Sequence, residues 1–374
     1  MTGRILAWLS VLLLLVSSAF GEVTEVRSQV GESFVSYPQL QGETGEEAEK
    51  KINEEILASS GVSRHLVTLV TLGEGDPGLQ VSYQVTWQGE GILSLVMDAR
   101  GKMPNRREGQ SWTPFTWWVE TGERVTLSDL FEDSQGALAA MEELISQSVS
   151  LSEYVENGEV LPLPETAFTL DETGITFYYD GEQLQYLSGV SGSCHFFWSE
   201  LSSWLKEEWI PVWLPEMTMT LEEQAEIIAR WAEAGKLPGF QVALGDSMEE
   251  VVNLYTLTRE PDVFPGGRYF EMEAALCRDV RLISDSMESG WEHSVLEGIQ
   301  LRRGGLPGLI IGTSTRAQVL LLLGEPAESI CYSSGMAFDY DLPEGISDQY
   351  RFGDYVLRLH TDEEGILRAI QLGR

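Results

Sequence analysis

Apolar and polar residues alternate most regularly between residues 79 and 87. The apolar positions are Leu79, Val81, Tyr83, Val85 and Trp87, and the residues between them are polar. A period of two is typical of a half-buried β-strand. A turn at 88–91 leads into a second apolar run at 92–97, so the pattern predicts a β-hairpin.

Helical spacing precedes and follows this hairpin. Thr44-Gly-Glu-Glu47 has the form of a capping box, and Ala48, Ile52 and Ile56 then recur at helical spacing. The segment 136–149 places its larger apolar residues on one helical face. We therefore expect two amphipathic helices, one after Thr44 and one at 136–149.

A third strand is expected between Phe115 and Glu120, and another at 175–179. Alternation puts Trp117 on one face of the third strand and Trp118 on the other. Trp118 must then be exposed or covered by a second layer. The helix expected at 136–149 is the predicted cover.

Two prolines, Pro211 and Pro215, interrupt the pattern before a new helix. Thr220-Leu-Glu-Glu223 has the form of a capping box, and Gly235 supplies a stop signal. We therefore place a boundary at 211–218. It separates a first unit at 22–212 from a C-terminal domain at 218–374.

The C-terminal domain contains an internal repeat. Leu237-Pro-Gly-Phe240 recurs as Leu306-Pro-Gly-Leu309, and each copy continues with Gly-x-Ser, a Val and Glu-Pro. The copies span about 237–300 and 306–374, and each predicts a strand, a Ser-capped short helix, a turn and further strands. The predicted fold class is α+β, with two units that are each an antiparallel sheet covered by helices, the second built from two sequence repeats.

The N-terminal residues have the form of a secretory signal. Arg4 precedes an apolar run from Ile5 to Val16, and small residues follow up to Gly21. Cleavage after Gly21 would remove a signal peptide at 1–21. A retained anchor helix is the alternative, although the run is shorter than the roughly 20 residues that cross a bilayer. We expect a secreted or cell-surface (extracytoplasmic) protein with no stable membrane span after cleavage.

The chain is strongly acidic, with 59 Asp and Glu residues, 24 Lys and Arg residues and a formal net charge of −35. Such a chain repels nucleic acid and attracts cationic proteins. The alternative is that acidity only keeps an exported protein soluble. The main basic cluster lies in a polar loop and includes Arg106 and Arg107. These residues, with Trp112 and Trp118, are the candidate binding residues, and a merely solvated loop is the alternative.

The residue types that carry catalysis or bind metals form no motif. The four histidines are isolated: His65, His195, His293 and His360. The three cysteines are equally scattered: Cys194, Cys277 and Cys331. We expect buried thiols or one bridge from Cys277 to Cys331, rather than a zinc site. No catalytic residue, metal or cofactor is predicted. Enzyme activity stays open, because a pair of distant carboxylates would leave no motif.

Three segments carry a resemblance to a known family. They are Ser36-Tyr-Pro-Gln39, the stretch Glu-Thr-Gly-Glu-Arg-Val-Thr-Leu-Ser-Asp-Leu-Phe at 120–131, and 168–178. Together they resemble the extracytoplasmic domain of RsiV-type anti-sigma factors and the N-terminal module of PdaC-type peptidoglycan deacetylases, over residues 30–205. The family usually has a Gly-Gly-Ala-His-like loop before the 120–131 stretch. This chain has Arg-Gly-Lys-Met-Pro-Asn at 100–105 instead, which puts loop-dependent properties in doubt.

The first resemblance implies a lysozyme receptor, and the second implies an accessory module. The repeat is similar to secreted bacterial domains of unknown function with an outer-membrane-assembly-lipoprotein or β-lactamase-inhibitor-like fold, mainly at 322–326. Such domains bind other proteins. We therefore expect an exported, non-catalytic cell-envelope binding protein of a Gram-positive-type bacterium. Its expected partner is a basic wall hydrolase, a cationic wall-active protein such as lysozyme. The alternatives are an enzyme or accessory module acting on cell-wall polysaccharide, and a structural wall-associated protein.

The leader predicts that the mature protein begins at or near Glu22 and is found outside the cytoplasm. N-terminal sequencing of protein from the secreted and wall fractions measures this directly. An intact Met1 on protein from the cytosol would contradict the prediction.

Overall fold

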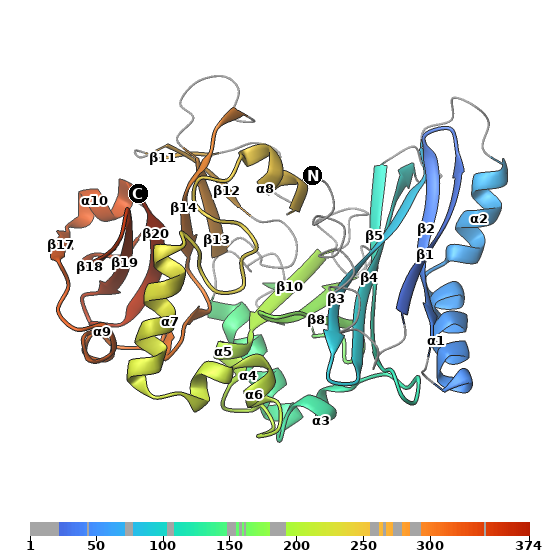
Figure 1. The fold of residues 1–374 in the computed structure, drawn as a ribbon, viewed down its shortest axis with the longest axis horizontal. Helices are drawn as coiled ribbons and strands as arrows, with labels where there is room; N and C mark the ends of the chain where they lie inside the picture. Colours follow the sequence, from blue (N-terminus) through green and yellow to red (C-terminus); the bar gives the residue numbers. More distant parts are fainter. Residues whose placement is uncertain are drawn as a thin grey trace, which may run out of the picture. The chain divides into compact units, whose positions relative to one another are not determined.

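A computed structural model describes most of the chain after residue 21. The described ranges are 22–42, 45–71, 78–102, 108–147, 155–156, 159–160, 162–179, 192–254, 262–264, 267–271, 279–284, 293–339 and 342–374. The predicted signal peptide, Arg106, Arg107 and Cys277 lie outside these ranges. The described residues form an α+β fold of antiparallel sheets and helices, as the sequence pattern predicts (Figure 1).

The chain divides into two compact units. The first comprises residues up to Asp129, Pro164–Asp171 and residues from Phe177 to Gly192. The second comprises Leu130–Leu163, Glu172–Thr176 and Ser193–Arg374. Each unit contains its own sheet and its own apolar core.

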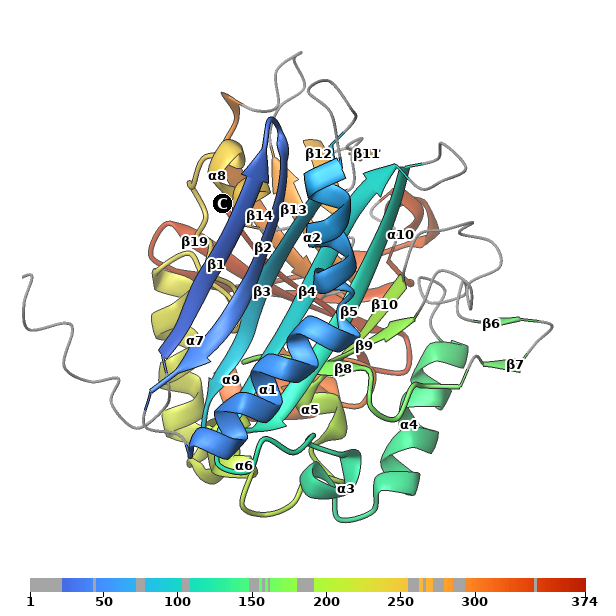
Figure 2. The same cartoon turned by 90° about the vertical axis from the view of Figure 1, so that its right-hand side faces the viewer.

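The first unit contains a five-stranded sheet in the order β1-β2-β3-β4-β5. The strands are β1 (Glu22–Val30), β2 (Ser33–Gln41), β3 (Gln80–Gly89), β4 (Ile92–Lys102) and β5 (Glu108–Trp118). Only β2 and β3 pair in parallel among these neighbours. A parallel pair needs a long crossover, and α1 (Glu46–Ser59) and α2 (Val62–Thr71) supply it. Both helices lie over one face of the sheet (Figure 2).

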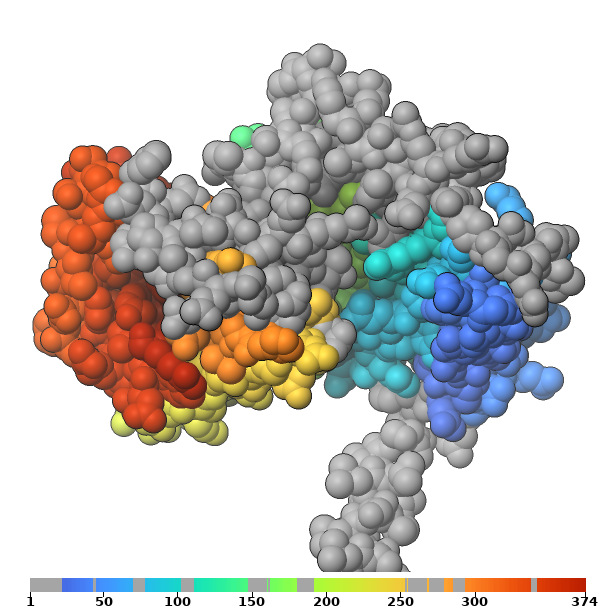
Figure 3. Space-filling model, turned by 90° about the horizontal axis from the view of Figure 1, so that it is seen from above, coloured from blue at the N-terminus to red at the C-terminus, as the bar shows by residue number. Residues whose placement is uncertain are grey.

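The core of this unit lies between the sheet and the two helices. The helix α1 contributes the predicted stripe of Ala48, Ile52 and Ile56, all buried. The sheet contributes the apolar face of its strands, namely Val35, Val81, Leu93, Leu95, Met97, Phe115 and Trp117. The strand β1 at one edge is exposed along most of its length (Figure 3). Its Glu22, Glu25 and Arg27 are charges of the kind that discourage edge-to-edge pairing.

The predicted alternation at 79–87 holds up to Val85 and then changes. Val85 pairs with Leu95 and Trp87 pairs with Ser94, so a bulge separates the two residues. Cross-strand partners point to the same face, which places Trp87 on the face opposite Val85. The expectation that both residues share one face was therefore wrong, because strict alternation does not anticipate a bulge.

A carboxylate on α1 ties that helix to β5. Glu55 accepts hydrogen bonds from Trp117 Nε1 at 2.7 Å and from Arg124 Nε at 3.0 Å. The Arg124 guanidinium lies 4.5 Å from the centre of the Phe115 ring. Gly122, at φ +68°, approaches so closely that a Cβ there would lie 2.8 Å from the Ala48 carbonyl oxygen. The 120–131 stretch is thus a turn docked against α1.

Shorter elements follow. They are α3 (Leu127–Leu130), α4 (Ser134–Gln147), β6 (Val155–Glu156), β7 (Glu159–Val160), β8 (Phe168–Leu170), β9 (Gly174–Tyr179), β10 (Gly192–Phe197), α5 (Trp198–Leu201), α6 (Ile210–Trp213) and η3 (Pro215–Thr218). A three-stranded sheet has the order β10-β9-β8. Pro211 and Pro215 lie in the first turns of α6 and η3, where the missing N–H of proline is tolerated.

The second unit contains an eight-stranded sheet in the order β11-β12-β13-β14-β20-β19-β18-β17. Its strands are β11 (Asp262–Phe264), β12 (Gly267–Glu271), β13 (Val280–Ser284), β14 (Leu296–Leu301), β17 (Glu328–Tyr332), β18 (Gly345–Phe352), β19 (Tyr355–Asp362) and β20 (Leu367–Gly373). A small hairpin joins β15 (Gly305–Leu306) to β16 (Leu309–Ile310). The helices are α7 (Leu221–Glu233), α8 (Met248–Leu254), α9 (Arg316–Leu323) and α10 (Ser334–Asp339).

The core of the second unit joins α7, α8 and α9 to one face of this sheet. Ile228, Val251 and Val319 from the helices share one apolar cluster with Leu282, Leu357 and Leu372 from the strands. The predicted capping box is present at α7, where Thr220 and Glu223 bond to each other's backbone N–H. The first cap of the chain was not found, since Gly45 begins α1 without a side-chain bond.

The sequence repeat corresponds to a structural duplication. Each copy is a turn, a short helix and four antiparallel strands, and the two last strands, β14 and β20, pair with each other. The backbone contacts also repeat. Gly245 N donates to Leu296 O at 2.7 Å, and Gly312 N donates to Leu367 O at 2.8 Å. Gly239 and Gly308 occupy equivalent turns at φ +77° and +72°. The two copies therefore form one continuous sheet.

The predicted serine caps are one residue out of place in the second copy. Ser247 Oγ accepts from Glu249 N at the start of α8, as expected. The cap of α9 is Thr315, which forms a capping box with Gln318. Ser314 Oγ instead accepts from Ile310 N at 2.7 Å and stabilises the preceding turn.

A buried ion pair joins two distant parts of the second unit. Arg303 donates from Nε to Glu200 Oε1 at 3.1 Å and from Nη2 to Glu200 Oε2 at 2.9 Å. Phe197 N donates to the same carboxylate at 3.0 Å. The two charged side chains are 9% and 6% exposed. Removing one partner would leave the other charge buried and uncompensated.

The boundary expected at 211–218 stays a prediction, and limited proteolysis measures it. If it is right, cleavage in this window gives two stable fragments, 22–212 and 218–374. One unit that resists cleavage there would contradict it. Trp213, which lies in the window, is buried and stacks on Trp198 and Trp209 with ring centres 4.2 and 4.7 Å apart, so the digestion should be followed over time.

Candidate binding surface

The strand β8 packs on the face of the first sheet that the helices leave uncovered. Two buried hydroxyls hold it there. Ser94 Oγ and Thr116 Oγ1 lie 3.0 Å apart, on neighbouring strands β4 and β5. Thr116 donates to the Phe168 carbonyl at 2.9 Å, and Leu170 N donates to Ser94 Oγ at 2.8 Å. These bonds satisfy backbone groups that would otherwise be buried without partners.

The cover expected for Trp118 was wrong in its identity. The helix predicted at 136–149 is α4, but within the first unit the element that packs on the face shared by Thr116 and Trp118 is β8. Its contact is centred on Thr116, which is 2% exposed, while Trp118 is half-buried. Hydroxyl side chains, rather than an amphipathic stripe, carry this contact, and hydrophobic spacing does not reveal them.

Trp112 lies on the same face, beside an aromatic and a carboxylate. Its ring meets the ring of Tyr178 edge to face, with centres 5.9 Å apart and planes at 76°. Asp98 is its direct cross-strand neighbour on β4. Tyr178 is positioned through β8, because its N–H donates to Ala167 O at 2.9 Å and its hydroxyl lies 3.2 Å from Thr169 Oγ1. Trp112, Tyr178 and Asp98 form what we call the Trp112 cluster.

Negative charge gathers at this cluster. Burial raises the pKa of Tyr178, the hydrogen bond with Thr169 opposes that rise, and the nearby carboxylates of Asp171 and Asp98 add to it. The Tyr178 hydroxyl therefore stays neutral, and two carboxylates face it. Asp98 also accepts a hydrogen bond from Arg100 Nε at 2.7 Å. The Arg100 side chain is 54% exposed and that of Asp98 is 17% exposed.

The structure places two of the four candidate binding residues. Trp112 and Trp118 both lie on β5 and are both half-buried. They share one face but are six residues apart, which corresponds to about 20 Å along a strand. The buried Pro114 and Thr116 lie between them, so the two rings belong to separate parts of the face. The other two candidates, in the basic loop, lie outside the described residues.

Sequence reasoning missed Asp98 and Tyr178. The alternation of β4 continues beyond Met97, and this signal would have placed Asp98 on the same face as Ser94. No local signal points to Tyr178, because it is distant in sequence and reaches Trp112 only through β8. Its burial is a consequence of tertiary packing.

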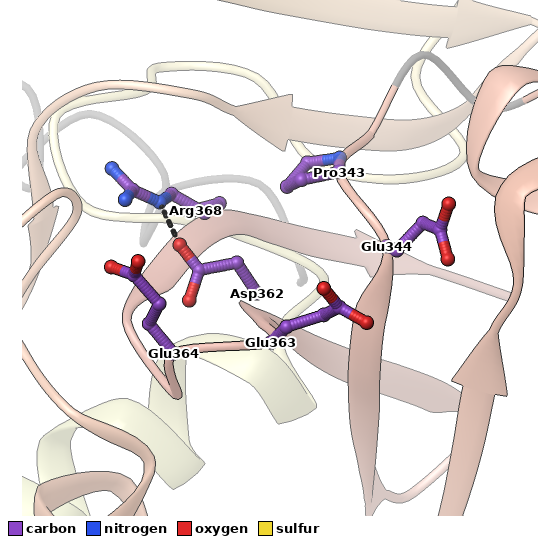
Figure 4. A pocket seen from close by; sticks show the side chains of 6 residues that line it. All are labelled: Pro343, Glu344, Asp362, Glu363, Glu364 and Arg368. Atoms are coloured by element: carbon purple, nitrogen blue, oxygen red, sulfur yellow. Dashed lines mark hydrogen bonds and ion pairs between the residues drawn. The ribbon is translucent and has the colours of Figure 1, made fainter.

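A second feature is an open hollow in the second unit, with a volume of about 390 Å³. Its lining is mostly charged and consists of Pro343, Glu344, Asp362, Glu363, Glu364 and Arg368 (Figure 4). Asp362 accepts from Ile366 N at 2.9 Å and from Arg368 Nε at 2.6 Å. Burial alone would raise the pKa of Asp362, but these bonds and the Arg368 charge outweigh it and lower the pKa. Asp362 is therefore ionised at neutral pH and is no proton donor there.

Two of the isolated histidines are core residues of the second unit. His195 is fully buried, with its ring nitrogens 2.8 and 3.1 Å from the hydroxyls of Thr176 and Thr173. His360 is 2% exposed, and its Nε2 lies 2.8 Å from the Pro343 carbonyl oxygen. The carbonyl can only accept, so Nε2 carries the proton and Nδ1 is the bare nitrogen. Among the described residues Nδ1 has no hydrogen-bond partner.

The described residues contain no group of three or more His, Cys, Asp or Glu side chains arranged to hold a metal ion. Cys194 is buried, whereas Cys331 is exposed, which differs from the expectation of buried thiols. None of the helices in the described ranges combines the length and the apolar character needed to cross a membrane.

No family model matches the sequence, and no curated protein matches it. Among solved structures, a DUF3298 family member from Bacteroides fragilis is similar, at 12% identity over 52% of this chain and 96% of that one, with a TM-score of 0.38. A DUF3298 family protein from Pseudomonas aeruginosa is similar at 10% identity over 50% of this chain and 94% of its own, with a TM-score of 0.32. A DUF4309 family protein from Bacillus subtilis is similar at 12% identity over 41% and 96% of the two chains, with a TM-score of 0.28. These similarities are low, and no property of those proteins is transferred to this chain.

His360 predicts a loss of stability in weakly acidic solution. Burial lowers its pKa from the ordinary value of 6.5, while the bond to Pro343 O and the Asp362 charge partly oppose this. The unfolded chain then binds a proton that the folded chain resists, so the stabilising contribution is present above about pH 6.5 and is lost as pH falls below it. His360→Gln keeps a donor for Pro343 O but does not ionise. The variant should therefore lose less stability between pH 7 and pH 5 than the parent, as measured by denaturant unfolding.

The exposed His293 offers the matched control, because His293→Gln removes an imidazole that is not buried. This control should follow the pH dependence of the parent. Identical slopes for the parent and for His360→Gln would show that His360 ionises as freely in the folded state as in the unfolded chain.

Proposed function

We propose that this chain is an exported, non-catalytic binding protein of the cell envelope, and that its first unit recognises a cationic wall-active protein such as lysozyme. The single observation that carries the proposal is the Trp112 cluster. It combines a half-buried indole, a buried tyrosine ring and the carboxylates of Asp98 and Asp171 on one face of the sheet. Aromatic side chains at the centre of such a surface are typical anchors of protein interfaces.

The charge of the chain supports a basic partner. A formal net charge of −35 draws cationic proteins toward the surface and speeds their encounter. Such attraction by itself does not discriminate between basic proteins. Discrimination has to come from contacts that exclude water, and the rings of Trp112 and Tyr178 supply apolar area beside the charged groups.

Two further arguments support the proposed setting. The apolar leader supports export, and the resemblance of residues 30–205 to the extracytoplasmic domain of RsiV-type anti-sigma factors supports a hydrolase as the partner. The resemblance rests chiefly on the 120–131 stretch, which is the turn docked on α1 through Gly122 and Arg124. That stretch supports the sheet from the helix side, opposite the Trp112 cluster, so it bears on the fold of the module more than on its contacts.

The proposal predicts that the mature chain, residues 22–374, binds lysozyme in solution. The association should weaken as salt rises, because exposed charges are screened over about 8 Å at physiological ionic strength. Binding should persist at moderate salt, because the aromatic contacts are not screened. Isothermal titration calorimetry at low and at physiological salt measures both effects.

Cytochrome c, a basic protein that is not a hydrolase, is the control for bulk charge. It should bind more weakly than lysozyme, and its binding should vanish at physiological salt. Equal affinities for the two proteins at both salt concentrations would reduce the effect to charge alone, and the receptor role would then be withdrawn.

A further inference from the structure

The Trp112 cluster has the composition of a site for a flat cation. The indole offers a face to which a cation is attracted, and Trp is the strongest of the aromatic side chains in this respect. Asp98 lies directly across the strand pair, at a distance of about 5 Å between Cβ atoms. Asp171 follows β8 and is the second carboxylate near the Tyr178 hydroxyl.

Arg100 shows which chemistry the cluster accepts. It lies two residues from Asp98 on β4 and donates from Nε to Asp98 Oδ2 at 2.7 Å. More than half of its side chain is exposed, so the pair is of the kind that contributes little free energy in water. A guanidinium from a partner, desolvated on binding, would gain more from the same carboxylate than Arg100 does.

The acidic hollow of the second unit differs in both respects. No aromatic side chain is part of its lining, and Asp362 is already bonded to Arg368 and to the backbone. The combination of an aromatic face with carboxylates therefore favours the Trp112 cluster as the place where a cationic side chain is recognised individually.

We propose that the partner places an arginine side chain over the Trp112 indole, with its guanidinium bonded to Asp98 and Asp171 and with Arg100 displaced. This inference rests on the proposed function, because the arginine belongs to the cationic partner. Arginine fits better than lysine, since a guanidinium is planar, is weakly hydrated, stacks on aromatic rings and binds carboxylates through two donors. The site thus distinguishes basic proteins by an exposed arginine and not by total charge.

The first arm of the test uses two small probes of equal charge. N-acetylargininamide and N-acetyllysinamide are titrated into the mature chain, and the indole N–H signals are followed by NMR. The Trp112→Phe variant assigns the Trp112 signal. The arginine probe should shift this signal at concentrations in the millimolar range, and the lysine probe should shift it less. Asp98→Asn should reduce the shift. Equal shifts from the two probes, or no shift from either, would overturn the inference.

The second arm measures lysozyme binding to substituted chains. Trp112→Ala should weaken binding about tenfold. Trp231→Ala, which removes a half-buried Trp from α7 in the other unit, should leave binding unchanged. Arg100→Ala should strengthen binding more than Arg351→Ala, although each removes one positive charge from an exposed position. Retention of the parent's thermal unfolding midpoint shows that each variant is folded.

The two arms separate the inference from the function on which it rests. If lysozyme binds the parent chain but Trp112→Ala and Arg100→Ala behave like their controls, the arginine site is wrong and the proposed function stands. If the arginine probe shifts the Trp112 signal but lysozyme does not bind, the site stands and the proposed partner is wrong.

Discussion

Two buried hydroxyls position the outer layer of the first unit. The strand β8 is only three residues long and lies on the face of β3, β4 and β5 without extending their sheet. A buried backbone group without a partner costs about 1–3 kcal/mol. Ser94 and Thr116 remove this cost by bonding Leu170 N and Phe168 O, and they bond to each other. The strand is thereby fixed in one position rather than sliding on an apolar surface.

The position of β8 decides the rest of this face. Tyr178 is bonded to Ala167 O and Thr169 Oγ1, so its ring lies where β8 puts it, against Trp112. On the other side of the sheet, Glu55 holds Trp117 and Arg124 at the same strand β5. The second unit uses similar contacts, since Asp348, fully buried, accepts from Arg316 and Ser329. Apolar layers supply the bulk of each core, and a few buried polar contacts define which surfaces meet.

The sequence predicts the elements better than the way they meet. The alternation at 79–87, the stripe of α1, the capping box at Thr220 and the repeat all correspond to observed features, because each depends on residues close in the chain. The bulge at Trp87 and the cover over Thr116 were missed. Both depend on partners far away in sequence, and serine or threonine looks the same whether it is buried or exposed.

The candidate site was found only in part. Trp112 stood out as an aromatic residue beside a basic loop, but Asp98 and Tyr178 join it through strand register and through β8. Pro211 and Pro215 illustrate a different limit. A proline that interrupts a pattern also fits the first turn of a helix, and here both prolines lie at such positions, in α6 and η3.

A double-mutant cycle on Ser94 and Thr116 tests most directly whether the hydroxyl pair positions this surface. The unfolding free energy is measured for the parent, Ser94→Ala, Thr116→Val and the double variant by denaturant titration. If the two hydroxyls act together on β8, each single substitution destabilises and the coupling free energy is about 1 kcal/mol or more. Strictly additive effects would show that each hydroxyl acts alone, and the account of β8 as a jointly held layer would be contradicted.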